Sequence, residues 1–253
     1  MPRLAPHLAA ALCCFAVSCT RAKALAPAEA AQSVLFIGNS YTYVNDLPST
    51  FSRLAASGGH PVSVAMIAPG GYKLFQHAAE RSTLDTISNR KWDWVVMQEQ
   101  SQVPSLGNLR LKEMYPAVRL LNHRIRESGA TPVLFLTWGR KQGSPEIGFA
   151  DFSSMQTQLS KGYRDIAEEL SIVVAPVGEA WKKAVRQRSS PELWSADGSH
   201  PSPAGTYLAA CVLYATLFRQ DPSGLAFRGD LPSASAKFLQ KIGGETALSD
   251  NSR

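Results

Sequence analysis

Five short stretches of nearly continuous hydrophobic residues recur along the chain after Gln32. Unbroken apolar character, without alternation, is typical of strands that are covered on both faces of a sheet. The pattern therefore predicts five buried strands, at residues 33–38, 62–68, 92–98, 132–138 and 171–177.

Longer amphipathic stretches lie between and after these strands. They predict helices near residues 48–57, 73–80, 110–128, 151–170, 179–188 and 203–219. Strands that alternate with helices favour a parallel sheet with helices on both faces and right-handed crossovers. We therefore predict an α/β fold, a three-layer α/β/α sandwich with a central five-stranded parallel sheet.

The chain has no internal repeat and no Pro/Gly/Ser-rich linker, so we predict one domain over residues 33–220. Residues 221–253 form a C-terminal extension in this interpretation. The extension is predicted to be partly disordered, with one helix near 233–242 and no order in the last ten residues.

The first 24 residues have the pattern of an export signal. Arg3 precedes a mostly apolar stretch at residues 8–19, which at about 12 residues is shorter than the roughly 20 that span a bilayer. Residues 22–24 (AKA) have the small-x-small form of an ordinary signal-peptidase site. Residues 16–19 instead resemble a bacterial lipoprotein box, which would leave a lipid on Cys19. Cleavage at either site predicts an exported protein, periplasmic or extracellular, and the second adds a membrane anchor. An uncleaved apolar N-terminus is the third interpretation.

Composition excludes several classes of protein. Of the 253 residues, 45% are hydrophobic and 18% are charged, as in globular proteins. Lys and Arg exceed Asp and Glu by 26 to 20, and by 23 to 20 without the first 24 residues. This excess is small and contains no basic run, so it gives no support for nucleic-acid binding.

The cysteines indicate neither a disulfide nor a zinc site. Cleavage at either site removes Cys13 and Cys14. Cys211 is retained, and in the lipoprotein interpretation Cys19 is retained as well. Cys211 lies in the apolar run YLAACVLYATLF and is predicted to be a buried small hydrophobic residue. No metal or cofactor is implied.

Residues that could do chemistry follow the predicted strands. Ligands of open α/β sheets bind at the carboxyl ends of the strands. The segments at these ends are residues 38–40 (GNS), 69–72 (PGGY), 98–101 (QEQS) and 138–140 (WGR), and residues 197–205 (DGSHPSPAG) precede the last predicted helix.

The segment at 197–205 suggests a serine nucleophile elsewhere in the chain. Asp197 and His200 are three residues apart in a turn, so the carboxylate can bind Nδ1 and leave Nε2 as a base. A serine hydroxyl needs such a base, and Ser40 at the end of the first strand is the natural partner. Attack on a carbonyl also creates an oxyanion that needs fixed donors. The candidate donors are the backbone N–H groups of Ser40 and Gly71 and a side-chain amide of Gln98 or Gln100.

Over residues 33–220, these blocks resemble the SGNH, or GDSL, hydrolase superfamily. They are most similar to a secreted bacterial branch with GNS, GG, QEQS and DGSHPSPAG blocks. The resemblance implies a flavodoxin-like SGNH fold and a catalytic triad of Ser40, Asp197 and His200. It also implies an oxyanion hole that includes Gly71, with Gly70 as a lesser candidate.

The sequence departs from the usual SGNH pattern at two positions. Asn39 stands where Asp usually precedes the serine, a change that should not remove the nucleophile. The third block has no Asn, and its amide could come from Gln98, Gln100 or Gln102. We rank Gln98 before Gln100 as the source of this amide.

Each candidate also has a purely structural interpretation. Ser40 could be a turn residue or a helix N-cap, Asp197 could cap the turn at Gly198, and His200 could be an ordinary packed histidine. His77 is expected on the surface or in packing. Glu99 is expected to pair with Arg140 or to be solvated. Aromatic residues near the site would pack the core or, alternatively, form a sugar platform; these are Tyr41, Tyr43, Tyr72, Trp138 and Trp194.

These observations together predict an exported serine ester hydrolase. Ser40 would attack the ester, and water would release the acid from an acyl-enzyme. By family analogy, the substrate is a small acyl ester, such as an acetyl group on a carbohydrate. The alternatives are an acyltransferase with the same triad and an inactive carbohydrate-binding relative. A nucleotide binder lacks support, because no strand is followed by GxGxxG or GxxxxGK[ST].

Overall fold

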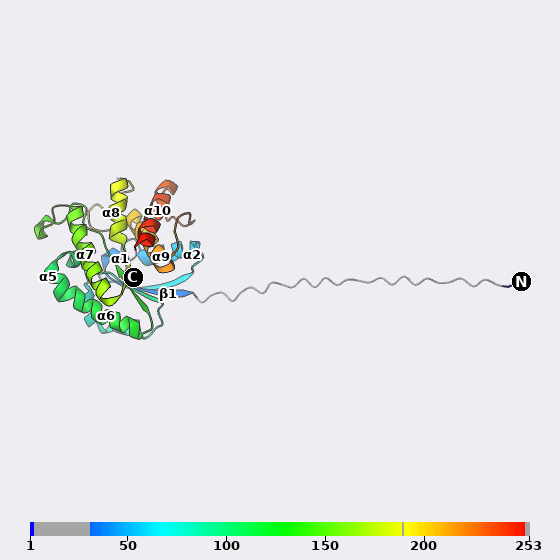
Figure 1. Cartoon of the computed structure of the whole chain (residues 1–253), viewed down its shortest axis with the longest axis horizontal. Helices are drawn as coiled ribbons and strands as arrows, with labels where there is room; N and C mark the ends of the chain where they lie inside the picture. The colour runs from blue at the N-terminus through cyan, green and yellow to red at the C-terminus, as the bar shows by residue number, and fades with distance from the viewer. Residues whose placement is uncertain (3–30, 189, 251–253) are drawn as a thin grey trace. The chain divides into compact units, whose positions relative to one another are not determined.

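The computed structural model describes residues 1–2, 31–188 and 190–250 (Figure 1). The compact unit that contains the sheet begins at Ala31. Apart from Met1 and Pro2, the predicted export signal lies outside the described residues, as do both of its cleavage sites and Cys19. Among the described residues, no helix is both long and apolar enough to cross a membrane.

The centre of the fold is a five-stranded sheet in which every pair of neighbouring strands is parallel. The strands are β1 (Gln32–Ile37), β2 (Val62–Ile67), β3 (Trp94–Met97), β4 (Thr131–Phe135) and β5 (Val173–Ala175). Their order across the sheet is β2-β1-β3-β4-β5. The predicted fold class is thus confirmed, and all five strands fall within two residues of their predicted starts.

Hydrophobic side chains cover both faces of the sheet, since successive residues of a strand point to opposite faces. In β1, Val34 and Phe36 belong to one buried cluster, whereas Leu35 and Ile37 belong to the other. The edge strand β2 is less covered, and its Met66 is 41% exposed. The prediction of complete burial therefore holds for most residues of the other four strands and not for β2.

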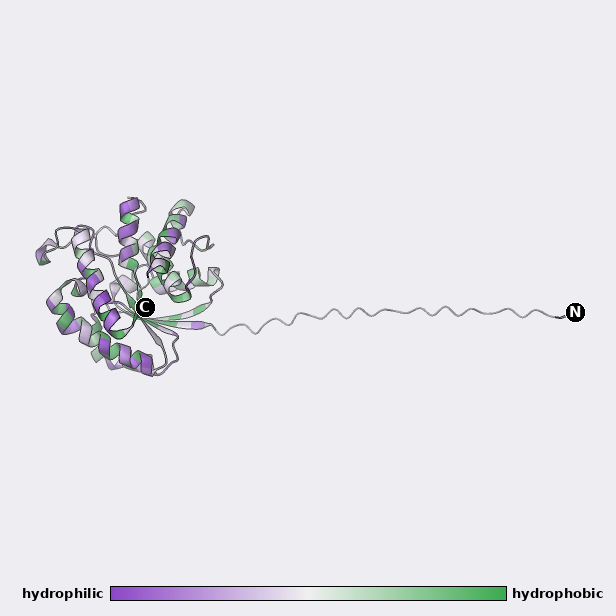
Figure 2. Ribbon diagram, viewed as in Figure 1, coloured by the Kyte–Doolittle hydropathy of each residue, from purple (hydrophilic) through white to green (hydrophobic). Residues whose placement is uncertain are grey.

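Helices form the two outer layers (Figure 1). The first layer packs on the face that carries Phe36, and the second on the face that carries Ile37. The first layer contains α2 (Leu47–Ser57), α8 (Val177–Gln187), α9 (Pro203–Phe218) and α10 (Ser233–Ser249). The second contains α3 (Leu74–Ala79), α4 (Arg81–Ser88), α6 (Tyr115–Glu127) and α7 (Phe152–Leu170). Figure 2 shows that several of these helices have both hydrophilic and hydrophobic residues, as expected of helices with one buried face.

Short helical turns occupy the connections. They are α1 (Ser40–Tyr43), η1 (Val103–Ser105), α5 (Gly107–Leu109), the π-helix η2 (Arg110–Met114) and η3 (Pro145–Ile147). The predicted helix at 110–128 is thus divided between η2 and α6. Neither α1 nor α4 was predicted.

The C-terminal segment is part of the core. Helix α9 is buried on nearly all sides, and α2 and α10 both pack against it. Gly243 of α10 lies against Cys211, where a Cβ would come within 2.7 Å of the cysteine Cβ. Cys211 is fully buried, as predicted. The prediction that the last ten residues lack order was wrong for residues 244–249, which continue α10.

Candidate active site

Ser40 lies at the carboxyl edge of the sheet, directly after β1. The strand ends at Ile37, and Ser40 is the first residue of α1. Asn39 is the N-cap of this helix, since its side chain accepts a hydrogen bond from the N–H of Tyr41 at 3.1 Å. The capping role that the sequence left open for Ser40 therefore belongs to Asn39, and the Ser40 hydroxyl is free for another partner.

The structure brings Ser40, His200 and Asp197 together in one hydrogen-bonded chain. Ser40 Oγ and His200 Nε2 are 2.9 Å apart. His200 Nδ1 and Asp197 Oδ2 are 2.5 Å apart. A carboxylate can only accept, so Nδ1 carries the proton, and in the neutral ring Nε2 is the acceptor for the serine hydroxyl. This is the arrangement in which an imidazole can remove the proton from a serine.

The turn at Asp197 holds its carboxylate in place. Gly198 has a φ of +67°, which glycine adopts readily. Asp197 Oδ1 accepts hydrogen bonds from the N–H groups of Ser199 at 2.9 Å and His200 at 3.0 Å. The hydrogen bond from His200 and these two backbone donors lower the pKa of Asp197 to about 2. Asp197 is therefore a carboxylate throughout the neutral range.

Aromatic side chains support the His200 segment from within the core. Tyr41 stacks on Trp138 with ring centroids 4.7 Å apart, and its hydroxyl lies 2.7 Å from Ser199 Oγ. Trp138 Nε1 donates to the Ser199 carbonyl at 3.0 Å. No sequence pattern indicated a role for Ser199, which lies between the two triad candidates. Its partners are distant in sequence, so no local pattern could reveal them.

This packing shows which of the five aromatic side chains could contact a sugar. Tyr41, Trp138 and Trp194 are buried, so they cannot present a ring face to a carbohydrate. Tyr43 is 43% exposed, and Tyr72 is half-buried. The proposed aromatic platform is therefore wrong for three of its five members.

A small cavity of about 150 Å³ lies beside Ser40 and His200. Its lining residues are Asn39, Ser40, Tyr41, Gly71, Gln100, Ser101, Arg140, Ser199 and His200. The backbone N–H groups of Ser40 and Gly71 donate to no residue that the structure describes. Gly71 has a φ of +72°, and Gly70 does not line the cavity. Of the two glycines, Gly71 is the one beside Ser40.

Gln98 does not face this cavity, because its amide is fully engaged in the interior. The side chain is completely buried. Its Oε1 accepts from the Asn39 N–H and from Thr42 Oγ1, both at 2.9 Å. Its Nε2 donates to Asn39 Oδ1 at 3.0 Å and to the Glu99 carbonyl at 2.6 Å. No N–H remains for an oxyanion, so the contacts reverse the predicted order of Gln98 before Gln100.

The Gln100 side chain lines the cavity and has donor capacity left. Its Oε1 accepts from the N–H groups of Gln102 at 2.8 Å and Val103 at 3.3 Å, which fixes the amide plane. Its Nε2 makes one long contact of 3.3 Å, to Ser101 Oγ. Gln102, the third candidate, is turned away and donates to Ser144 Oγ at 3.1 Å. Gln100 is therefore the glutamine that can offer an N–H next to Ser40.

Arg140 supplies a positive charge at the cavity wall. Its side chain is 33% exposed, and Nη1 makes long hydrogen bonds of 3.3 Å to Glu146 and 3.4 Å to Ser144. The expectation that Glu99 pairs with Arg140 or is solvated was wrong. Glu99 is completely buried, and its carboxylate contacts backbone N–H groups instead.

His77 lies beneath the serine segment. It is completely buried, so the interpretation as a surface residue was wrong and that as a packing residue holds. Its Nε2 is 2.8 Å from the Gly38 carbonyl, and Nδ1 is 3.3 Å from Thr83 Oγ1. Burial lowers the pKa of His77. A neutral ring that donates from Nε2 to Gly38 stabilises the end of β1 just before Ser40.

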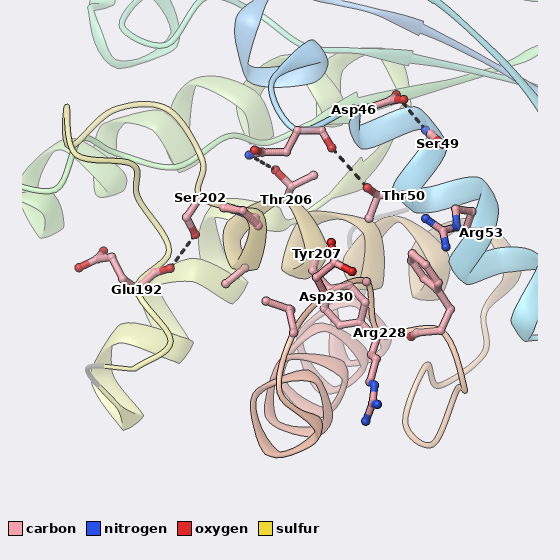
Figure 3. A pocket seen from close by; sticks show the side chains of 16 residues that line it. Asp46, Ser49, Thr50, Arg53, Glu192, Ser202, Thr206, Tyr207, Arg228 and Asp230 are labelled. Carbon is pink, nitrogen blue, oxygen red and sulfur yellow. Dashed lines mark hydrogen bonds between the residues drawn. The ribbon is translucent and has the colours of Figure 1, made fainter.

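A second cavity is larger, with a volume of about 680 Å³. Figure 3 shows the side chains that line it. Residues from the starts of α2 and α9 and from the 227–231 segment line it, including Asp46, Ser49, Thr50, Arg53, Ser202, Tyr207 and Arg228. Ser40, Gly71 and His200 are absent from its wall. Within the described parts of the chain, no group of three His, Cys, Asp or Glu side chains could hold a metal ion.

Comparison with solved structures finds this fold in several hydrolases. The chain is similar to a protein from Slackia heliotrinireducens that is described as an SGNH hydrolase. The two sequences are 31% identical, the match covers 74% of this chain and 99% of that one, and the TM-score is 0.64.

Two further structures have the same fold at lower sequence identity. A DUF4886 family protein from Bacteroides uniformis is 19% identical, with a TM-score of 0.70 over 86% of this chain and 95% of that one. The acetylxylan esterase Axe2 from Geobacillus stearothermophilus is 19% identical, with a TM-score of 0.57 over 72% of this chain and 92% of that one. No protein-family model matches the chain, and no curated protein matches it.

Proposed function

The chain belongs to the SGNH hydrolases, and on this premise we propose that it is a serine ester hydrolase. Ser40 is the nucleophile, His200 is the general base and acid, and Asp197 orients His200. One observation carries the assignment, namely the 2.9 Å hydrogen bond between Ser40 Oγ and His200 Nε2, with Asp197 on the far side of the ring.

The reaction begins when His200 Nε2 takes the proton of Ser40 Oγ as this oxygen attacks the ester carbonyl. Asp197 stabilises the imidazolium that forms. The carbonyl oxygen becomes an oxyanion, which accepts hydrogen bonds from the N–H groups of Ser40 and Gly71 and from Gln100 Nε2. The tetrahedral intermediate collapses, the C–O bond to the alcohol breaks, and His200 returns its proton to the departing alkoxide.

Water completes the cycle by the same steps. His200 removes a proton from the water as it attacks the acyl-enzyme, and the oxyanion forms again at the same donors. Collapse of the second intermediate breaks the bond between the acyl group and Ser40 Oγ. The proton held by His200 passes to the serine, and the carboxylic acid leaves.

The size of the cavity supports a small acyl group. A volume of about 150 Å³ beside Ser40 suits an acetyl group better than a long fatty chain. Axe2, a structural neighbour, is an acetylxylan esterase. We therefore include in the proposal an acetyl or similarly small ester, carried by a small molecule or by a carbohydrate.

The decisive experiment compares hydrolysis of nitrophenyl esters of increasing acyl length by the wild type, Ser40→Ala and Ser49→Ala. Ser49 lines the larger cavity and serves as the matched control. We expect Ser40→Ala to lose at least about 10³-fold in kcat and Ser49→Ala to match the wild type. Equal rates for the wild type and Ser40→Ala would overturn the mechanism.

Two further measurements separate hydrolysis from the alternatives. A fluorophosphonate probe should label Ser40 in the folded wild type, and an unlabelled protein would favour the inactive carbohydrate-binding relative. Release of free acetate, measured against acetylation of an added sugar, distinguishes a hydrolase from an acyltransferase. We expect free acetate to be the main product.

Export is also part of the proposal, and its support is the pattern of the first 24 residues alone. Expression of the full chain in a bacterial host, followed by mass analysis of the N-terminus in each cell fraction, tests it. A mature chain that begins with lipidated Cys19 would identify a lipoprotein, and cleavage after residue 24 would identify a secreted form. An intact N-terminus in the cytoplasm would contradict export.

A further inference from the structure

Glu99 is the most unusual ionisable group next to the proposed site. Its side chain is completely buried, and Oε2 has no hydrogen-bond partner among the described residues. Burial raises the pKa of Glu99 to about 7.

The other carboxyl oxygen joins two loops that carry proposed oxyanion donors. Glu99 Oε1 accepts from the Leu74 N–H at 3.1 Å and from the Gln100 N–H at 2.6 Å. Leu74 begins α3, three residues after Gly71, and Gln100 carries the side-chain amide. A single atom thus fixes the loop after β2 against the loop after β3.

The backbone of Glu99 extends this link to the serine. Its carbonyl accepts from Gln98 Nε2 at 2.6 Å, and Gln98 in turn accepts from the Asn39 N–H at 2.9 Å. Its N–H donates to the Tyr163 hydroxyl of α7 at 3.1 Å. Glu99 is therefore connected to all three segments that carry the donors, although it does not line the cavity itself.

We propose that Glu99 is a positioning residue for the oxyanion hole, which holds the Gly71 loop and the Gln100 loop at the spacing that the oxyanion requires. This inference rests on the proposed function, because an oxyanion hole has meaning only if Ser40 attacks a carbonyl. Donors must be placed within about 0.5 Å to be effective. The carboxyl acts through Gly71 and Gln100 and touches no reacting atom.

The test compares Glu99→Gln with Glu99→Leu. Glutamine keeps an oxygen that can accept both N–H groups, whereas leucine has a similar size and leaves them without an acceptor. We expect Glu99→Leu to lose about 10²-fold in kcat, the usual effect of losing one oxyanion donor, with KM within about threefold. Glu99→Gln should keep kcat within about fivefold of the wild type.

Gln240→Leu provides the matched control for general destabilisation. Gln240 is also buried, and its Oε1 accepts from the Gly224 N–H at 3.1 Å, far along the chain from the site. This variant should lower the melting temperature and leave kcat unchanged. A folded Glu99→Leu with wild-type kcat would overturn the proposal. So would a Glu99→Gln as inactive as Glu99→Leu, because a direct role of the carboxyl would then be needed.

Amide hydrogen exchange separates this proposal from the proposed function. In Glu99→Leu the amides of Leu74 and Gln100 should exchange faster, and in Glu99→Gln they should stay protected. A wild type that hydrolyses no ester would overturn the ester hydrolase assignment and with it the catalytic meaning of the link. Unchanged exchange at both amides in Glu99→Leu would overturn the link itself, even in an active enzyme.

Discussion

Asn39 and Gln98 bind each other across the carboxyl edge of the sheet. The Asn39 N–H donates to Gln98 Oε1 at 2.9 Å, and Gln98 Nε2 donates to Asn39 Oδ1 at 3.0 Å. These two residues lie in the two blocks where the sequence departs from the usual pattern of its superfamily. The two amides together hold the segment before Ser40.

Replacing Asn39 with Asp should destabilise the protein. Asn39 is 2% exposed, and its Nδ2 donates to the Tyr72 carbonyl at 2.8 Å. A carboxylate cannot donate there and would place a buried charge beside that carbonyl, at a cost of about 2 kcal/mol in the free energy of unfolding.

The cost of Asn39→Asp should grow as the pH rises, since a protonated carboxyl could still donate to Tyr72. Urea unfolding of both proteins at pH 5 and pH 8 measures it. If the difference in the free energy of unfolding between the wild type and Asn39→Asp were the same at both values of pH, this explanation of the pair would be contradicted.

Gln98 and Gln100 should differ in what their loss does. Gln100→Glu keeps the Oε1 acceptor and removes the Nε2 donor, so we expect kcat to fall about 10²-fold or more with little change in stability. The Gln98 amide makes all of its hydrogen bonds to buried groups, and Gln98→Leu would leave those groups unpaired. This variant should therefore mainly lower the free energy of unfolding, by about 2 kcal/mol or more.

Steady-state kinetics and urea unfolding of both variants test this contrast, with Gln102→Ala as the control that should resemble the wild type in kcat. If Gln100→Glu kept wild-type kcat, Gln100 would not be an oxyanion donor.

Asp197→Asn should keep the fold and lose most of the activity. The amide cannot stabilise an imidazolium, and it favours the wrong tautomer of His200, so we expect kcat to fall by about 10³-fold or more. Ester hydrolysis by this variant and by the exposed control Asp230→Asn measures the effect. Activity of Asp197→Asn within tenfold of the wild type would remove Asp197 from the triad.

The lowered pKa of Asp197 predicts how the stability of the protein depends on pH. Its folded pKa, about 2, is below the ordinary 3.8 of an aspartate. The stability gained from this shift is fully present above pH 3.8 and is lost as the pH falls toward 2. The stability of the wild type relative to Asp197→Asn should therefore fall as the pH is lowered from 5 toward 2. Urea unfolding of both proteins over this range measures it, and a stability difference that stays constant would contradict the assignment.

The raised pKa of Glu99 predicts the opposite effect, a loss of stability as the pH rises. Its folded pKa of about 7 is above the ordinary 4.5, so the fold favours the protonated carboxyl. The penalty is absent below pH 4.5, grows between 4.5 and 7, and is constant above 7. A shift of this size corresponds to roughly 3 kcal/mol at high pH.

Urea unfolding of the wild type and Glu99→Gln from pH 4.5 to 8 measures this penalty, since the amide does not titrate. The charged groups that act on Glu99 are Lys73 and Glu113, which pair with each other at 2.7 Å, and the Tyr163 hydroxyl faces its backbone. Parallel stability curves for the two proteins would show that Glu99 does not titrate in this range.

Local sequence pattern was sufficient to predict the sheet and to place the candidate site segments at its carboxyl edge. A continuous apolar run such as 33–38 buries its side chains on both faces when the strand lies between two layers of helices. Parallel strands also bring their carboxyl ends to one edge of the sheet. Ser40 and Gly71 follow two such strands. Asp197 and His200 are three residues apart, so their contact is local and could be predicted from the chain alone.

Long-range packing sets which side chains face the cavity and which are buried beneath it. Gln98, Glu99 and Gln100 are consecutive polar residues with no local feature that separates them. Gln98 is turned inward by Asn39, which is distant in sequence, and Glu99 is held by the Leu74 backbone. A buried polar group takes whichever partner the packed chain brings within about 3 Å, and that choice is made by the fold as a whole.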